Sequence, residues 1–461
     1  MLIILWASQC DVCAYILVKR IVFGCVLGRL QEGIYYGTEK RPRDSFAILF
    51  LKCEKGCTAK EIGHALVQLW EKYRSFKTVH SYSSYDDYVP YLQNLSVLIG
   101  YGKTVFSLEG AYRECPKDFS DIGLLNPKNS GGGSVIENSE LSFDENVNYN
   151  HAAFDDIVIQ FIADKEFVTS EAVVESWKEL RKINSSRAVL QLSKFYTGFA
   201  RYDNRGWMGF HDGVSNMKSE ERKYAISIDS SKLNTDDRWT INGTFLMFMR
   251  IAIDVEEWWK LSVEEQEVVV GRDKKNGYPL VGVDANGKPV IDKRVPKINA
   301  TEVTEPGNEM FRDHPEYGNQ GTLPKGVNDQ ILNYSHIGAM RRINHFPAWK
   351  IESNSIFRQG FEFLEPSDRK TIQVGLNFVS FQNTPQRLFN TLTSWTKYEK
   401  RYSETPKNMY LKFNKYLSVI SAGLYFVPPM EEGAPFPGSS IFFGKDIFDK
   451  EYLPPSTSWP T

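Results

Sequence analysis

Three side chains of different chemical types could together carry out chemistry on a peroxide. Asp212 lies in the segment 209–213 (GFHDG), His336 follows more than a hundred residues later, and Arg358 lies farther on. Splitting a peroxide O–O bond at an open ferric haem needs a neutral imidazole below the iron, and an acid–base group and a cation above it. This combination of residue types therefore fits peroxide chemistry at a haem iron.

Each of the three residues also has a purely structural interpretation. Asp-Gly is a common turn dipeptide, which suits Asp212. A lone histidine such as His336 is more often structural than a ligand, and an arginine such as Arg358 is usually solvated. The three residues taken one by one do not establish a site.

Composition limits the class of protein. The chain has 461 residues, of which 42% are hydrophobic and 13% aromatic. This size predicts two domains or one large composite domain with a substantial core. The net charge is −2 and the pI is near 6.4. No basic stripe interrupts this balance, which argues against a nucleic-acid partner.

The first 26 residues are apolar, but Asp11, Lys19 and Arg20 interrupt them. No uncharged run approaches the ~20 residues that span a bilayer, so no membrane span is expected. All six cysteines lie in the first quarter of the chain. This distribution does not predict a disulfide framework and favours a cytoplasmic over a secreted protein. The spacing of Cys10 and Cys13 leaves a zinc or redox site open.

Apolar spacing predicts alternating strands and helices. In the first half we expect strands at 45–52, 91–98 and 156–163, with helices at 58–73 and 171–183. In the second half we expect strands at 244–253 and 375–382, helices at 255–269 and 385–393, and a long surface excursion at 273–332. The pattern indicates an α+β fold with helices packed on antiparallel sheets.

Eight blocks of sequence, in the same order, resemble dye-decolorising peroxidases. They are 195–199 (FYTGF), 206–216 (GWMGFHDGVSN), 242–248 (NGTFLMF), 265–272 (EQEVVVGR), 335–337 (SHI), 356–360 (IFRQG), 375–381 (GLNFVSF) and 423–429 (GLYFVPP). The resemblance covers roughly residues 30 to 450 and points to one of the longer subclasses of the family.

The resemblance implies two ferredoxin-like domains that together resemble a dimeric α+β barrel. Residues 29–200 would form the N-terminal domain, and residues 201–455 the C-terminal domain. The second domain would hold one haem b per chain. Residues 1–28 would be an N-terminal extension.

The family pattern also implies roles for individual residues. His336 would be the proximal iron ligand and therefore the metal-binding residue. Asp212 would be the distal acid–base group, and Arg358 would stabilise charge on the departing oxygen. At its reference pKa of ~3.9, such an aspartate stays ionised even in mildly acidic solution.

Other residues would line the haem pocket. Leu376 and Phe378, two apart on one strand, would narrow its distal side, although plain core packing also explains them. His211 competes with Asp212 as the acid–base group; the resemblance favours Asp212 and leaves His211 behind it or facing a propionate. The family often continues its proximal histidine with a basic pair and Asn-Pro-Arg, whereas this chain reads GAMRRINHFP at 338–347. Either Arg341 or Arg342 could therefore contact a propionate.

The sequence thus predicts an H2O2-dependent haem peroxidase. Its partners would be H2O2 and a reducing aromatic substrate such as a dye or phenol, and a homo-oligomer is compatible with the sequence. One alternative is a haem-handling protein whose peroxidase activity is incidental. Another is a non-catalytic interaction protein built on ferredoxin-like domains.

Overall fold

The structure of the protein is a computed structural model. The structure describes residues 28–37, 43–78, 91–92, 94–120, 155–211, 217, 219–229, 235–291, 335–336, 354–367, 372–388, 391 and 416–444.

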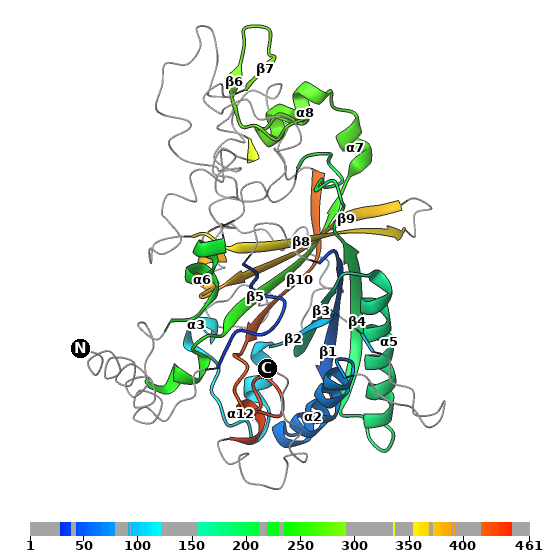
Figure 1. Ribbon diagram of the computed structural model, residues 1–461, viewed down its shortest axis with the longest axis vertical. Helices are drawn as coiled ribbons and strands as arrows, with labels where there is room; N and C mark the ends of the chain where they lie inside the picture. Colours follow the sequence, from blue (N-terminus) through cyan, green and yellow to red (C-terminus); the bar gives the residue numbers. More distant parts are fainter. Residues whose placement is uncertain are drawn as a thin grey trace, which may run out of the picture.

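Antiparallel strands from both halves of the chain close into one barrel (Figure 1). In order around the barrel they are β1 (Ser45–Cys53), β3 (Ile157–Ala163), β2 (Ser96–Tyr101), β10 (Leu417–Val427), β5 (Thr244–Ile253), β9 (Ile372–Gln382), β8 (Phe357–Pro366) and β4 (Leu190–Phe199). Strand pairs β2–β10 and β4–β8 join the two halves. The predicted α+β barrel-like class is confirmed, while the predicted domain boundaries remain a prediction.

Alternation along each strand separates a barrel interior from an outer face. The interior is filled mainly by aromatic and branched side chains, including Phe50, Phe248 and Phe361. The amide Nε2 of Gln359 points inward as well and donates to the backbone oxygens of Gly33 and Ile34 at 3.0 and 3.1 Å. Because these inner positions are fixed, the intervening residues of the same strands must face outward.

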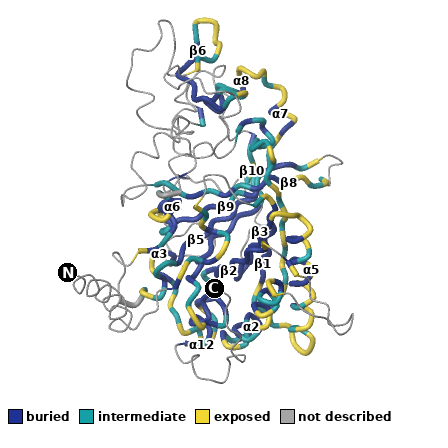
Figure 2. The backbone as a smooth tube through the Cα atoms, viewed as in Figure 1, coloured by how far each residue is buried: buried dark blue, intermediate teal, exposed yellow. Residues whose placement is uncertain are grey.

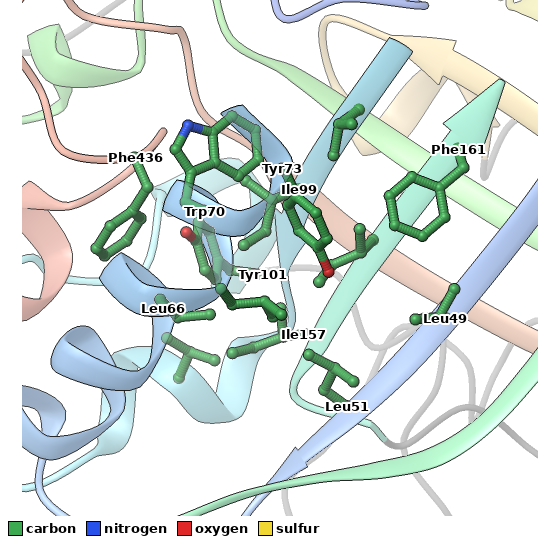
Figure 3. Close-up of a cluster of buried hydrophobic side chains, with 14 of the residues drawn as sticks. Leu49, Leu51, Leu66, Trp70, Tyr73, Ile99, Tyr101, Ile157, Phe161 and Phe436 are labelled. Carbon is green, nitrogen blue, oxygen red and sulfur yellow. The ribbon is translucent and has the colours of Figure 1, made fainter. Parts of the chain in front are cut away.

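Two long helices cover the outer face of the first half. They are α2 (Ala59–Ser75) and α5 (Glu166–Ile183), which also contact each other. Thr58 and Glu61 form a capping box that starts α2, and this arrangement satisfies two otherwise unpaired backbone donors. Beneath the helices, Leu49 and Phe161 contribute to a dense apolar cluster (Figure 3).

The second half carries shorter elements. They are α6 (Ser219–Ile226), α7 (Val255–Trp259), α8 (Val263–Val270), β6 (Leu280–Val283), β7 (Pro289–Ile291) and α12 (Ser440–Phe443); η2 (Lys103–Ser107), α3 (Lys117–Ser120) and η4 (Thr235–Thr240) complete the described elements. In Figure 1, α7, α8 and the β6–β7 hairpin project from one end of the barrel. We refer to residues 255–291 as the lobe.

Four of the predicted elements differ from the structure. The strand predicted at 91–98 is β2, which begins only at Ser96 and ends at Tyr101. Helix α5 begins at Glu166 and not at residue 171. The helix predicted at 255–269 is two helices, because Ser262 caps a new one. The excursion predicted at 273–332 contains the β6–β7 hairpin within its described part. Among the described residues, no helix is long and apolar enough to cross a membrane.

Candidate active site

Adjacent strands β8 and β9 bring three of the predicted site residues onto one outer surface. In the strand register, Gly360 pairs with Phe378, and Arg358, two residues earlier on β8, pairs with Ser380. Leu376 lies two residues before Phe378 and therefore faces the same side. Strand β5 extends this surface, because Ile251 pairs with Leu376. We call Ile251, Arg358, Leu376 and Phe378 the outer wall.

The outer wall is apolar but incompletely covered. Ile251, Leu376 and Phe378 are half-buried, whereas Val379 and Phe381 on the inner side of β9 have no exposure. Arg358, also half-buried, adds a positive charge at one side of the wall. The wall therefore combines partly accessible apolar surface with a cation.

A carboxylate at the edge of this wall was missed from the sequence. Glu362 is only 6% exposed and lies opposite Leu376 in the register. Its Oε1 approaches Gly206 so closely that an added Cβ there would lie 3.1 Å away. The pKa of Arg201 is raised, first by its hydrogen bond to Asp203 and further by the charge of Glu362. The signal was available, since Glu362 follows Arg358 by four residues and a strand places both on one face.

The segment that leads into Asp212 is held as a tight turn. The guanidinium of Arg205 donates to the backbone oxygens of Gly209, Lys274 and Lys275 at 2.6, 2.7 and 2.8 Å. Gly209 has a φ of 86°, a conformation that favours glycine. A Cβ at Gly209 would lie 2.6 Å from Cε of Lys274. Arg205 thus ties this turn to the lobe.

Packing fixes the same turn from a second direction. Met208 and Phe210 are buried in a small apolar cluster with Trp258 and Tyr416. The indole nitrogen of Trp258 donates to the backbone oxygen of Met208 at 3.1 Å. The lobe therefore supports the turn that precedes Asp212.

The ring of His211 contacts the guanidinium of Arg205. Nη2 of Arg205 lies 2.8 Å from Nε2 of His211. A guanidinium can only donate, so Nε2 must accept and the ring proton must lie on Nδ1. The pKa of His211 is lowered by burial and then by the charge of Arg205. Burial and the charge of Arg205 therefore favour the neutral ring, and a hydrogen bond to the backbone of Lys275 opposes them only in part.

The structure places the remaining predicted residues only in part. His336 is half-buried, follows the buried Ser335, and has a buried Nδ1 atom. Asp212, Arg341 and Arg342 lie outside the described residues, as do Cys10 and Cys13. Within the part of the chain that is described, no group of three or more His, Cys, Asp or Glu side chains could hold a metal ion.

The closed antiparallel barrel with helices packed on it places the protein in the α+β class. The sequence pattern of the family described as "Dyp-type peroxidase, C-terminal" matches residues 203–432. The chain belongs to the Dyp-type peroxidase family.

Solved structures share the fold at low sequence identity. Ferric DtpA from Streptomyces lividans aligns with a TM-score of 0.59 and 18% identity, covering 90% of this chain and 98% of that one. A DyP-type peroxidase from Cellulomonas bogoriensis aligns with a TM-score of 0.62 and 16% identity, covering 91% and 98%. At such identities the likeness describes the fold.

Similar characterised proteins include enzymes named deferrochelatase. The one from Escherichia coli K12 is 24% identical over 237 residues, which are 51% of this chain and 45% of that protein. The chain thus spans less than half the length of this relative.

Proposed function

We propose that this protein is an H2O2-dependent haem peroxidase. The observation that carries the proposal is the outer wall, where a half-buried arginine lies beside half-buried apolar side chains on the strands of a Dyp-type fold. The structurally similar DtpA from Streptomyces lividans was solved in a ferric state, which supports an iron cofactor here. The reducing substrate would be an aromatic molecule such as a dye or phenol.

The described residues fit a haem b. A porphyrin is planar and apolar, and the half-buried Ile251, Leu376 and Phe378 offer apolar surface that the protein's own core leaves partly accessible. One neutral imidazole suffices to hold the iron, and His336 would supply it. Arg341 or Arg342 would pair with a propionate.

When bound, the haem would supply the iron at which the peroxide is split and the electrons that reduce it. Asp212 would accept the proton from one oxygen of H2O2 and return it to the other, which leaves as water. Arg358 would stabilise the negative charge that develops on the leaving oxygen. Leu376 and Phe378 would exclude larger molecules from this side.

Titration with haemin tests the iron ligand directly. The wild-type protein should give a Soret band at one haem per chain, and His336→Ala should lose it or shift it strongly. His64→Ala is the matched control, because His64 lies on α2 away from the wall. Equal spectra for all three proteins would exclude His336 as the ligand.

Addition of one equivalent of H2O2 then tests the reaction. The Soret band should shift promptly and return when an aromatic reductant is added. Asp212→Ala and Arg358→Ala should slow the shift at least ~100-fold, while haem binding is retained. A band that is only bleached would contradict the peroxidase proposal.

A second function, haem handling with incidental peroxidase activity, is favoured by the relatives named deferrochelatase. That name describes the removal of iron from a chelate. Incubation of the haem-loaded protein with a reductant should then release iron and leave the fluorescence of a metal-free porphyrin. Rapid peroxide turnover without this fluorescence would favour the peroxidase.

A further inference from the structure

Helix α5 carries an apolar stripe on its outward face. Phe167, Val174 and Trp177 are 68%, 44% and 51% exposed. Their spacing of seven and three residues places them on one side of the helix. Figure 2 shows exposed positions recurring along α5 at the outer edge of the molecule. An exposed stripe of large apolar residues is typical of an interaction surface.

The stripe continues onto the neighbouring strand. Glu175 and Ser176 face α2, where they contact Lys72 and Tyr73. Helical spacing therefore turns Trp177 to the opposite flank, toward β4. On the outer side of β4, Phe195 and Phe199 are 49% and 37% exposed. We call these two residues and the α5 stripe together the α5–β4 face.

Charges on α5 are arranged with opposite signs at its two ends. Among the outward-facing charges, Glu166 and Glu171 lie in the N-terminal half, and Lys178, Arg181 and Lys182 lie in the C-terminal half. The other two acidic side chains, Glu175 and Glu179, are only 7% and 15% exposed and pair with lysines of the same chain. A second copy of the same helix running in the opposite direction would therefore meet complementary charge at both ends. The charges of α5 are therefore complementary to those of a second, antiparallel copy.

We propose that the α5–β4 face joins two copies of this protein across a twofold axis near Val174. In that arrangement Glu171 of each copy lies beside Lys178 of the other, and Phe167 lies beside the guanidinium of Arg181. The small Ser170 faces the large Trp177. A contact of this kind is isologous, since the same patch serves both copies.

Lys178 is able to serve both copies. Its Nζ lies 2.6 Å from Oε1 of Glu175, and Glu175 is also held by Lys72 at 2.6 Å. Glu175 therefore keeps a cation when Lys178 turns toward the partner's Glu171. The side chain of Lys178 is 52% exposed, so it has room to turn.

The size of a stable interface explains why β4 must take part. Such interfaces bury about 800 Å² on each partner, more than one helix face provides. Phe195 and Phe199 supply additional aromatic surface, and aromatic side chains are enriched at protein–protein interfaces. The association does not require a cofactor, so it is independent of the proposed function.

Sedimentation velocity of the full chain between about 1 and 50 µM tests the interface. We expect a dimer whose dissociation constant rises at least tenfold in Trp177→Ser. Trp259→Ser is the matched control, because Trp259 is 67% exposed on α7. A wild-type protein that stays monomeric throughout overturns the proposal, as does an equal effect of both substitutions.

A charge exchange separates this interface from an unspecific loss of stability. Glu171→Lys and Lys178→Glu should each weaken the dimer, because like charges then meet across the axis. The double variant Glu171→Lys with Lys178→Glu restores opposite charges and should regain the dimer, with far-ultraviolet circular dichroism confirming the fold of every variant. Failure of the double variant to associate more tightly than both single variants would contradict the proposed register.

Discussion

The outer faces of the two halves of the barrel differ in how they are covered. In the first half, α2 and α5 cover β1 and β3 so fully that Leu49 and Phe161 have no exposure. In the second half, Leu376 and Phe378 occupy comparable outward positions on β9 but are only half-buried. Over β1 and β3 the outer face is completed by the protein's own helices, whereas the outer wall of the second half offers apolar surface to another group.

The same contrast separates two arginines on opposite sides of the second half. Arg250 lies inside the barrel at 1% exposure, with its guanidinium 3.5 Å from the ring centre of Phe363 and 2.7 Å from Oδ1 of Asn377. It also pairs with Glu365 at 2.5 Å. Arg358 lies on the outer wall and is half-buried. One arginine is therefore part of the core, and the other lies on a surface that a ligand can reach.

The largest expected effect comes from a matched pair of phenylalanines. Phe161→Ala should lower the free energy of unfolding by about 3–5 kcal/mol, because it opens a cavity beneath Tyr73. Phe378→Ala should cost about 1 kcal/mol in the haem-free protein, since its ring is already partly exposed. Urea denaturation of both variants measures the difference. Equal losses would mean that the two faces are packed alike.

The two phenylalanines should also differ in how much bound haem stabilises the protein. A ligand that binds only the folded state raises its stability, so haemin should stabilise the wild type more than Phe378→Ala. Phe161→Ala should keep the wild-type increment. If haemin stabilises both variants equally, Phe378 does not contact it.

The two arginines give the next largest effects, in different measurements. Arg250→Ala should lower stability by about 2–3 kcal/mol, because it leaves the buried Oδ1 of Asn377 without its donor. Arg358→Ala should change stability little but slow the reaction with peroxide at least ~100-fold. Urea denaturation of both variants measures the loss of stability, and stopped-flow absorbance measures the rate of the reaction with peroxide. A stable Arg250→Ala protein, or an unstable Arg358→Ala protein, would contradict the division of roles between the two arginines.

Two capping boxes should give effects of about 1 kcal/mol. Thr58→Ala removes the cap of α2, a helix that belongs to the barrel core, and should lower the global free energy of unfolding. Ser262→Ala removes the cap of α8 in the lobe, where it should increase amide exchange locally. Hydrogen exchange with mass spectrometry distinguishes the two. A global loss in Ser262→Ala would show that the lobe unfolds together with the barrel.

The sequence predicted well those elements whose signal is local. Strands β1, β3, β5 and β9 and helix α2 have apolar spacing of the correct period, and the structure confirms them. The interruption between α7 and α8 was missed, although Ser262 followed by Glu265 has the residue spacing of a capping box. The start of α5 was missed because its first turn presents Phe167 to solvent, which contradicts the usual polar outer face.

The outer wall could be predicted only in part. Alternation within a strand places Leu376 and Phe378 on one side, and Arg358 and Glu362 on one side of another strand. Only the register between β8 and β9 unites these two sets, and register depends on pairing between distant segments. The neutral state of His211 was equally hidden, because it depends on the approach of Arg205 in space.

The smallest expected effect is the contribution of His211, in the turn that the lobe supports, to the pH dependence of stability. Burial and the charge of Arg205 lower the pKa of His211 in the folded protein, while the unfolded chain keeps a value near ~6.5. Below that pH the unfolded chain takes up a proton that the folded protein does not, so the free energy of unfolding falls as pH falls. This contribution is fully present above pH ~7, where the ring is neutral in both states.

His211→Gln should therefore flatten the dependence of stability on pH between about 5 and 7 and leave the region above pH 7 unchanged. Unfolding curves across both ranges provide the measurement and its internal control. An unchanged slope below pH 7 would mean that His211 takes up its proton over the same pH range in the folded and the unfolded chain, so that burial and Arg205 do not lower its pKa.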